Sequence, residues 1–260
     1  MLEPAVSVAV HHVTKSFAAG GKHERILNDV SFHVREGEIV SILGQSGCGK
    51  STLLGLIAGF DKPDEGRILT SGQEVKGPAK HCVMLFQNYG LLPWRSVASN
   101  VELGLLELPA EERRSRALAY LKLVGLGDRA GHFPHQLSGG MQQRAALARA
   151  LAIRPKIILM DEPFAALDTF TRYYLQNELL NIHAREQTTI VLVTHDIDEA
   201  VFLSDRVLIM GAGPGQIRRE FRLQSSRPRD RGHDEFQHYR KLILDEFRFT
   251  DGPSAEEYSI

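Results

Sequence analysis

The stretch GQSGCGKS, residues 44–51, has the residue types and the spacing needed to hold phosphate groups. It fits the pattern G-x-x-x-x-G-K-[S/T], with the apolar run 39–43 before it and an expected helix, about 50–58, after it. Its glycines let backbone N–H groups approach phosphate oxygens, and the N-terminus of the helix adds a favourable dipole. We therefore expect Lys50 to reach the β- and γ-phosphates of a nucleotide and the Ser51 hydroxyl to bind Mg²⁺.

An ordinary glycine turn is the alternative interpretation of this loop. Cys48 is interpreted as a small side chain that the loop tolerates. The residues expected to contact the nucleotide here are Gly44, Gln45, Ser46, Gly47, Cys48, Gly49, Lys50, Ser51 and Thr52.

A second apolar run, IILMDEP at residues 157–163, ends in two carboxylates. In P-loop enzymes an acid at this place holds Mg²⁺ directly or through water, which predicts that role for Asp161. Glu162 is placed to orient or deprotonate an attacking water. A pair of helix-capping acids is the alternative, but it explains only one of the two carboxylates.

A glutamine and a histidine also follow expected strands. Gln87 ends the segment MLFQN just before the chain becomes helical, and His195 follows the apolar run TIVLVT. Ligands of parallel sheets bind at the carboxyl ends of the strands, which favours a functional role for both residues. Gln87 could coordinate Mg²⁺ or water and report the nucleotide state to the helical region. For His195, a core histidine is the alternative.

The stretch LSGGMQQR, residues 137–144, is a second glycine-containing turn that opens a helix. Ser138 is expected to cap the helix, Gly139 and Gly140 permit close approach, and the dipole presents positive charge. A plain helix cap is the alternative. Because this helix is expected to lie too far from Lys50 to share its nucleotide, we infer a head-to-tail pair of chains. Ser138 of each chain would then close on the γ-phosphate held by Lys50 of the other.

These side chains need a sheet to position them, and the sequence predicts one. Apolar runs followed by helical patterns indicate buried parallel strands, and β-branched alternation in residues 6–17 and 26–44, with a turn at Gly20-Gly21, indicates further strands. We predict an α/β fold with a mostly parallel P-loop NTPase-type sheet, an N-terminal antiparallel β-subdomain and an inserted α-helical lobe. The ATPase domain is expected over residues 5–224, with the lobe at about 88–152.

Residues 225–260 are expected to form a C-terminal extension. The stretch SSRPRDRG, residues 225–232, is interpreted as a solvated arginine-rich linker, because short charge runs usually are solvated. The final residues are expected to fray. Between them lies a helical pattern whose apolar face is formed by Phe236, Tyr239, Ile243 and Phe247.

Composition narrows the class of protein. With 260 residues, 43% of them hydrophobic, the chain can bury a sizeable core, and its formal net charge of -1 gives no electrostatic reason to expect a nucleic-acid partner. Two cysteines exclude a disulfide framework and fit a reducing compartment. No apolar run approaches the ~20 residues of a membrane helix, and the N-terminus lacks the layout of a secretory signal. We therefore expect a cytoplasmic chain that needs another subunit for any work in a membrane.

Taken together, the motifs resemble those of ATP-binding cassette (ABC) transporter ATPases. The stretch LSGGMQQR is highly specific to that family, and the resemblance extends over roughly residues 6–220. The motifs that come in the order and spacing of the family are GQSGCGKS, Gln87, LSGGMQQR, IILMDEP, ALD at 166–168 and His195.

The resemblance implies a role for each matching residue. Glu162 resembles the catalytic base, and His195 resembles the switch histidine that contacts the γ-phosphate. Gln87 resembles the Q-loop residue beside the reacting centre, and Asp161 and Ser51 resemble residues that associate with Mg²⁺.

Three further positions are assigned by the same resemblance. Asp168 resembles the D-loop aspartate that couples two nucleotide sites. Phe17, in VTKSF, resembles the aromatic residue that stacks on adenine, with a core aromatic as the alternative. Ala165 departs from the family, which often has Gly or Ser there, and this affects local flexibility rather than the class.

A narrower resemblance implies an importer subunit. The stretches FQNYGLLPWRSVASNV, ALDTFTR, THDIDEAVFLSDRVLIM and GPGQI look like those of ATPase subunits that serve importers of taurine, aliphatic sulfonates, nitrate and related small anions. The resemblance implies ATP and Mg²⁺ as ligands and an ATP-dependent dimer. It also implies a permease docked at Gln87–Trp94, an indirect extracytoplasmic solute-binding protein, and a position at the cytoplasmic face of the inner membrane. Taurine-type subunits are the nearest match. Leu91, Leu92 and Trp94 could instead be core residues of the lobe.

Two other classes of protein remain as alternatives. A soluble ABC protein acting on DNA or ribosomes usually carries a long coiled-coil insertion or two cassettes, and the sequence shows neither. An ordinary P-loop kinase leaves LSGGMQQR unexplained.

Overall fold

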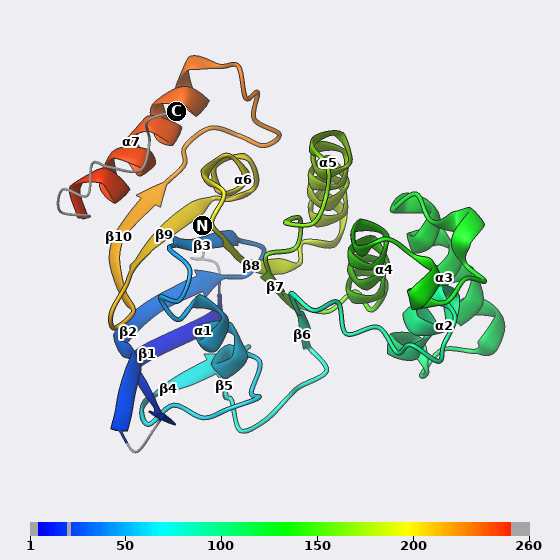
Figure 1. Cartoon of the computed structure of the whole chain (residues 1–260), viewed down its shortest axis with the longest axis horizontal. Coiled ribbons are helices and arrows are strands. Elements are labelled where there is room, and N and C mark those ends of the chain that lie inside the picture. Colours follow the sequence, from blue (N-terminus) through cyan, green and yellow to red (C-terminus); the bar gives the residue numbers. More distant parts are fainter. Residues whose placement is uncertain (1–4, 20–21, 251–260) are drawn as a thin grey trace.

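The apolar run Ile39–Gly44 forms strand β3, which lies inside a six-stranded sheet with the order β10-β9-β3-β8-β7-β6 (Figure 1). The computed structural model describes residues 5–19 and 22–250. Every residue of β3 is buried, as expected for a parallel strand covered on both faces. The sheet is parallel except at β10, which pairs antiparallel with β9. Its other strands are β6 (Cys82–Leu85), β7 (Ile157–Asp161), β8 (Thr189–Thr194), β9 (Arg206–Gly211) and β10 (Gln216–Arg222).

A second sheet is antiparallel and has the order β2-β1-β4-β5. It carries the N-terminal part of the chain, and the two sheets together confirm the predicted α/β fold class. The Gly20-Gly21 turn that the sequence suggested lies outside the described residues. The strands of this sheet are β1 (Val6–Ala19), β2 (Lys22–Arg35), β4 (Glu65–Thr70) and β5 (Gln73–Glu74).

Helix α1 (Lys50–Ile57) follows β3 directly and packs between the two sheets. Successive side chains of a strand point to opposite faces, and β3 divides its residues accordingly. Val40 and Ile42 pack with α1 and the antiparallel sheet, whereas Ile39 and Leu43 pack with the core on the other face. The phosphate-binding loop between β3 and α1 is therefore anchored by two hydrophobic cores.

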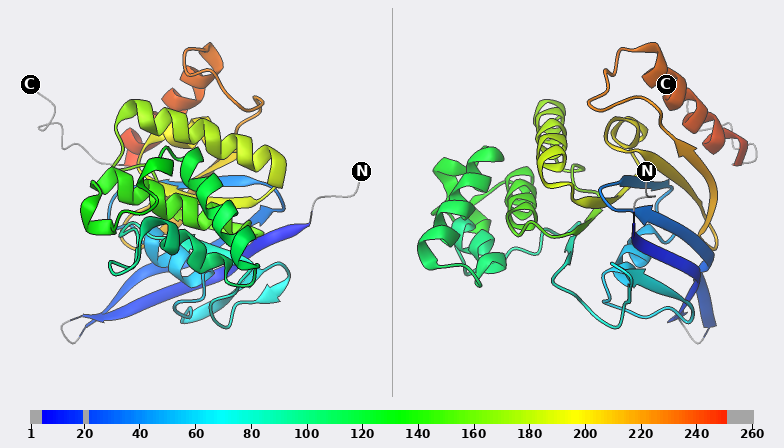
Figure 2. Two further views of the ribbon diagram at one scale, coloured as in Figure 1. Left: turned by 90° about the vertical axis from the view of Figure 1, so that its right-hand side faces the viewer. Right: turned by 180° about the vertical axis from the view of Figure 1, so that it is seen from behind.

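A helical lobe is inserted between β6 and β7, and it projects from one side of the sheets (Figure 2). Its helices are α2 (Val97–Glu102), α3 (Ala110–Leu123) and α4 (Gly139–Ala152), joined by short 3₁₀ turns at Leu103–Leu105, Gly127–Arg129 and Pro134–Gln136. Buried alanines and leucines of α4 pack against α2 and α3. In the described residues, no helix is both long and apolar enough to span a lipid bilayer.

Two helices, α5 (Thr169–Glu186) and α6 (Ile197–Leu203), cover the other face of the parallel sheet. We call residues 223–250 the C-terminal arm, which passes over α6 and ends in α7 (Asp234–Thr250). The apolar face of α7 packs as expected, with Phe236 and Ile243 buried and Tyr239 and Phe247 partly buried against the core.

The expectation of a solvated arginine linker is wrong. Arg229 is only 6% exposed, and its Nη1 donates to the carbonyl oxygens of Val201 and Ser204 at 2.9 and 2.7 Å. Arg227 donates to Leu203 O and pairs with Asp205. The end of a helix leaves carbonyl oxygens without intrahelical partners, and these arginines supply donors to the end of α6.

Candidate functional site

The phosphate-binding loop is held in shape by its own lysine. Lys50, the first residue of α1, is 6% exposed, and its Nζ donates to the carbonyl oxygens of Gly44 and Gln45 at 2.7 and 2.8 Å. Gly49 has φ +98°, and a Cβ there would lie 2.7 Å from a methyl carbon of Leu27. Only glycine fits this position without strain, so the turn depends on it.

Asp161 ends β7, two strands away from β3 across β8, and it is 6% exposed. Burial raises the pKa of its carboxyl, as does the neighbouring charge of Glu162, whereas a hydrogen bond from Ser51 and the charge of Lys50 lower it. The Ser51 hydroxyl at the start of α1 is thus brought to the carboxylate of Asp161. A buried carboxylate beside a hydroxyl supplies the oxygen ligands that Mg²⁺ prefers.

Glu162 and His195 meet at the carboxyl ends of β7 and β8. Glu162 Oε1 lies 3.1 Å from His195 Nδ1, and the histidine side chain is 60% exposed while that of Glu162 is 18% exposed. The Glu162 backbone is in the left-handed region, with φ +49°, and its N–H donates to Val193 O at 3.0 Å. Strained backbone of this kind collects at functional sites, because the surrounding structure must hold it there.

Gln87 lies after β6 in an exposed segment that leads into the lobe. The backbone two and three residues further on is fixed by Arg149 of α4, whose guanidinium donates to the carbonyl oxygens of Tyr89 and Gly90 at 2.8 and 2.7 Å. Sequence reasoning missed Arg149, because its partners lie about sixty residues away. Its signal was a cation among the alanines and leucines of the second half of α4.

The turn at Ser138 caps α4, with its hydroxyl accepting a hydrogen bond from Met141 N at 3.3 Å. A Cβ on Gly140 would lie 3.1 Å from Ala166 O, and one on Gly139 would lie 3.5 Å from the Tyr89 hydroxyl. Among the described hydrogen bonds, none joins Ser138 to Lys50.

Gln143 in the same helix is a second residue that sequence reasoning missed. It is 4% exposed; its Nε2 donates to Glu162 O at 3.0 Å, and its Oε1 accepts from Ala166 N at 3.1 Å. The helix that starts at LSGGMQQR is therefore bonded to the loop that carries Glu162. A glutamine on a face with Ala146 and Ala150 was the available signal.

Two more predicted residues lie on the surface around these loops. Asp168 caps α5 by accepting from Thr171 N at 3.0 Å, and hydrogen bonds from the Thr171 side chain and backbone lower the pKa of Asp168. Phe17 on β1 is 43% exposed, with Lys15 Nζ 5.1 Å from the ring centroid, so it is not a core aromatic. An exposed ring is available for stacking on a planar ligand.

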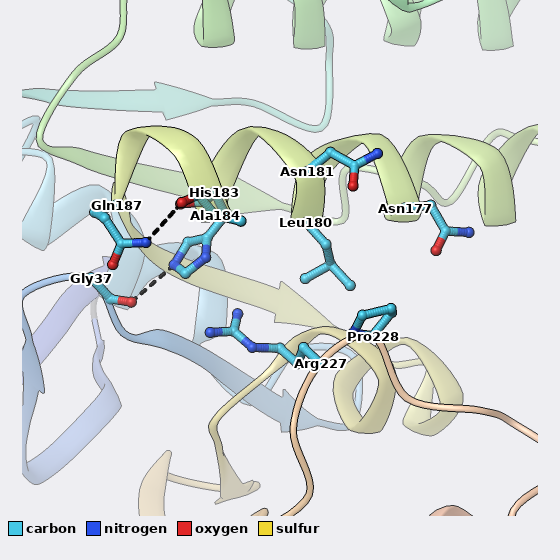
Figure 3. Close-up of a pocket in the computed structure, with 9 residues that line it drawn as sticks. All are labelled: Gly37, Asn177, Leu180, Asn181, His183, Ala184, Gln187, Arg227 and Pro228. Atoms are coloured by element: carbon cyan, nitrogen blue, oxygen red, sulfur yellow. Dashed lines mark hydrogen bonds between the residues drawn. The ribbon is translucent and has the colours of Figure 1, made fainter.

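A cavity between α5 and the C-terminal arm lies apart from these motifs (Figure 3). Its polar lining groups have protein partners: His183 Nε2 lies 2.9 Å from Gly37 O, and Arg227 pairs with Asp205. Burial lowers the pKa of His183. None of the predicted nucleotide contacts lines this cavity.

The phosphate-binding loop, the two acids and the histidine therefore gather at one edge of a parallel sheet. The sequence model of the family described as "ABC transporter" matches residues 27–165. The chain belongs to the ABC transporter family, as the motifs implied, and it is an ATP-binding ATPase of that family.

Relatives place it more closely. The chain is 49% identical over 241 residues to an uncharacterized ABC transporter ATP-binding protein of Methanocaldococcus jannaschii, covering 92% of this chain and 90% of that one. It is 39% identical to an aliphatic sulfonates import ATP-binding protein of Bacillus cereus, covering 94% and 97%. It is 47% identical to a nitrate import ATP-binding protein of Synechococcus elongatus, covering 87% of this chain and 35% of that one, so it spans about a third of that relative.

A solved structure agrees with this placement. A dimeric ATP-binding cassette in a post-hydrolysis state, bound to ADP and Pi, superposes with a TM-score of 0.78 at 38% identity. The match covers 84% of this chain and all of that chain.

Proposed function

We propose that the chain is the ATP-hydrolysing subunit of an importer and works as a head-to-tail dimer around two ATP molecules. One observation carries the dimer: Lys50, Asp161, Glu162 and His195 gather at one sheet edge, while Ser138 caps a helix that makes no described hydrogen bond to Lys50. A second copy supplies the Ser138 turn from the opposite side. The dimeric cassette with 38% identity supports this arrangement.

The residues of the site divide the work of hydrolysis. Lys50 and the loop N–H groups bind the β- and γ-phosphates, and Phe17 stacks on adenine. Glu162 accepts the proton of the attacking water, and His195, held by Glu162, contacts the γ-phosphate. Gln87 contacts the water or the metal and connects the site to the lobe, and Asp168 couples the two sites.

Ser51, Asp161 and Gln87 would hold Mg²⁺. Their oxygen atoms suit this cation, and the burial that raises the pKa of Asp161 is a cost that a neighbouring dication offsets. Bound Mg²⁺ supplies positive charge that neutralises the phosphates.

The test of the dimer uses Glu162→Gln, which keeps the shape of the side chain and removes its basicity. With ATP, this variant should accumulate as a closed dimer because binding proceeds and the water is not activated. ADP should not support the dimer, since the γ-phosphate is the shared contact. Adding Ser138→Arg should abolish it by placing bulk where the backbone approaches phosphate. Cross-chain distances between paired spin labels measure closure, and a closed dimer in all three conditions would refute the arrangement.

The importer transports a small anion, with taurine or another sulfonate ahead of nitrate or cyanate. The sulfonate-importer relative, which is matched over 97% of its length, supports the first candidate, and the nitrate-importer relative, which has the higher identity of 47%, supports the second. A permease docked at Gln87–Trp94 places the subunit at the cytoplasmic face of the inner membrane, with a solute-binding protein outside. Loss of growth of a deletion strain on taurine as sole sulfur source, with growth on sulfate retained, tests the solute. Unchanged growth on taurine contradicts it.

A further inference from the structure

Glu199 is an acidic residue of α6 that is only 5% exposed. Its Oε2 accepts a hydrogen bond from Gln176 Nε2 at 3.3 Å, while its Oε1 makes none within the part of the chain that the structure describes. It lines a cavity of about 50 Å³ that Glu162 and His195 also line. A buried acid beside the two residues proposed to act on ATP needs an explanation, because burying a carboxyl is costly.

Glu199 contacts both neighbours of His195. The Thr194 hydroxyl accepts from Asp196 N at 3.0 Å, which closes the backbone turn around His195. A hydroxyl has one proton to donate, and the interaction of Thr194 with the Glu199 carboxyl lowers the pKa of that carboxyl. Asp196 in turn accepts from Glu199 N at 3.1 Å. The bond to Asp196 comes from the Glu199 backbone, so the Glu199 carboxyl itself meets this turn on the Thr194 side, in the cavity that Thr194 and His195 also line.

The C-terminal arm contacts Gln176, the hydrogen-bond partner of Glu199, through Arg231. The Arg231 guanidinium lies between two rings, with its Cζ 3.9 Å from the Tyr173 centroid and 3.6 Å from the Phe202 centroid, and it donates to Gln176 Oε1. The amide of Gln176 in turn donates a hydrogen bond to Glu199. Arg231 therefore joins α5, α6 and the arm, which runs alongside α5 just before this point (Figure 3).

The surroundings of Glu199 shift the pKa of its carboxyl. Burial, followed by the charge of Asp196, raises its pKa to about 8, while Thr194, Arg172 and Gln176 lower it. Arg172 of α5 pairs with Asp196 at 3.3 Å. Glu162 and His195 face the same cavity.

We propose that Glu199 is a positioning residue for His195, held in place by Gln176 and by Arg231 of the C-terminal arm. The inference rests on the proposed role of His195 in ATP hydrolysis. It gives the arm a part in the reaction: removing Arg231 leaves Gln176 and Glu199 free to turn, and the turn around His195 loses its anchor.

The test follows the ring signals of His195 by NMR in the full chain labelled at histidine, assigned with His195→Gln. Arg231→Lys keeps the charge but loses the planar contact with the two rings, and Glu199→Leu removes the carboxyl. Both should shift the His195 signals and lower kcat about ten- to a hundredfold, with KM for ATP within about twofold, since small misplacements are costly.

Glu199→Gln keeps the shape of the side chain, and it replaces Glu199→Leu in the test if Glu199→Leu fails to fold. Because burial raises the pKa of Glu199 to about 8, the wild-type His195 signals should move as pH rises through 8, and this movement should vanish in Glu199→Gln. Arg240→Ala is the matched control, because Arg240 joins the arm to Asp198 on the surface of α6. It should leave the signals and kcat unchanged.

The inference is overturned if the His195 signals of Arg231→Lys and of Glu199→Gln coincide with the wild-type signals at every pH in this range. A separate measurement, the ATPase rate of His195→Gln, tests the proposed function. If His195→Gln hydrolyses ATP at the wild-type rate, the role of His195 is wrong, while the NMR signals still report whether Glu199 positions it.

Discussion

The ammonium of Lys50, which is proposed to bind phosphate, donates to two carbonyl oxygens of its own loop, those of Gly44 and Gln45. A buried ammonium with two carbonyl partners lacks a full counter-charge. In the proposed function, a phosphate group would supply that charge.

Lys50→Ala should weaken ATP binding about ten- to hundredfold, the equivalent of the roughly 1.5–3 kcal/mol that a hydrogen bond to a charged group contributes. Titration with a fluorescent ATP analogue measures the dissociation constant. Lys76→Ala, on an exposed segment, changes the net charge equally and should leave affinity unchanged. Near-wild-type affinity in Lys50→Ala would refute the assignment of this loop.

The sequence predicted those residues of the proposed nucleotide site that belong to short motifs of neighbouring positions. Lys50 follows its glycines directly, and Asp161 and Glu162 end the strand that carries them. Glu199 depends on Gln176 of another helix, and Arg231 on residues of α5 and α6, so no local pattern marks their connection.

At the scale of elements, α4 connects three loops through side-chain hydrogen bonds. Its first turn carries Ser138, its buried face holds the Glu162 loop through Gln143, and its last turns hold the segment after Gln87 through Arg149. Burial lowers the pKa of Arg149. Its guanidinium is held in place by its two carbonyl partners. A shift of α4 relative to the sheet would therefore move all three loops together.

Gln143→Leu should lower the free energy of unfolding by about 2–4 kcal/mol, since Glu162 O and Ala166 N lose their partner in a buried place. It should also slow ATP hydrolysis, because the Glu162 loop is released. Gln142→Leu is a useful comparison: it loses bonds to Pro134 O and Leu137 O, which are remote from Glu162. Denaturant unfolding and steady-state ATPase assays should then separate the two variants. Equal loss of activity in both would show that Gln143 acts through general stability.

The elements themselves were largely predictable, because buried strands and glycine punctuation are local signals. The arm was not. SSRPRDRG has the composition of a solvated linker, and its arginines become buried only because the end of α6 and the rings of Tyr173 and Phe202 lie beneath it. These partners come from 24 to 58 residues earlier, beyond the reach of periodicity.

At the scale of the whole molecule, the surface proposed for the permease is marked by Trp94, which is 71% exposed. Single exposed apolar side chains are common on protein surfaces, so the proposal rests on the place of Trp94 in the stretch that follows Gln87. Leu91 instead packs against the core of the lobe, and Leu92 is partly buried with its backbone bonded to Asn100. Of the three apolar residues in this stretch, Trp94 is therefore the one available to a partner.

Trp94→Glu should leave the isolated chain folded, with an unfolding free energy within about 0.5 kcal/mol of wild type, as is usual for surface substitutions. In cells it should abolish solute uptake and recovery of the chain with the membrane fraction. Thermal unfolding and membrane fractionation measure the two effects. Phe170→Glu, which changes another highly exposed aromatic on a different element, provides the comparison for membrane attachment. Normal attachment of Trp94→Glu would place the permease elsewhere.

The order of strands in the parallel sheet also constrains how the chain is made. Both neighbours of β3, β8 and β9, come after the inserted lobe, and 145 residues separate the end of β3 at residue 44 from the start of β8 at residue 189. At translation rates of about 5–20 residues per second, the fully buried strand β3 waits roughly 7–30 s for a partner in the sheet. The nascent chain therefore carries an unpaired hydrophobic strand through most of its synthesis, which makes it a natural client of ribosome-associated chaperones.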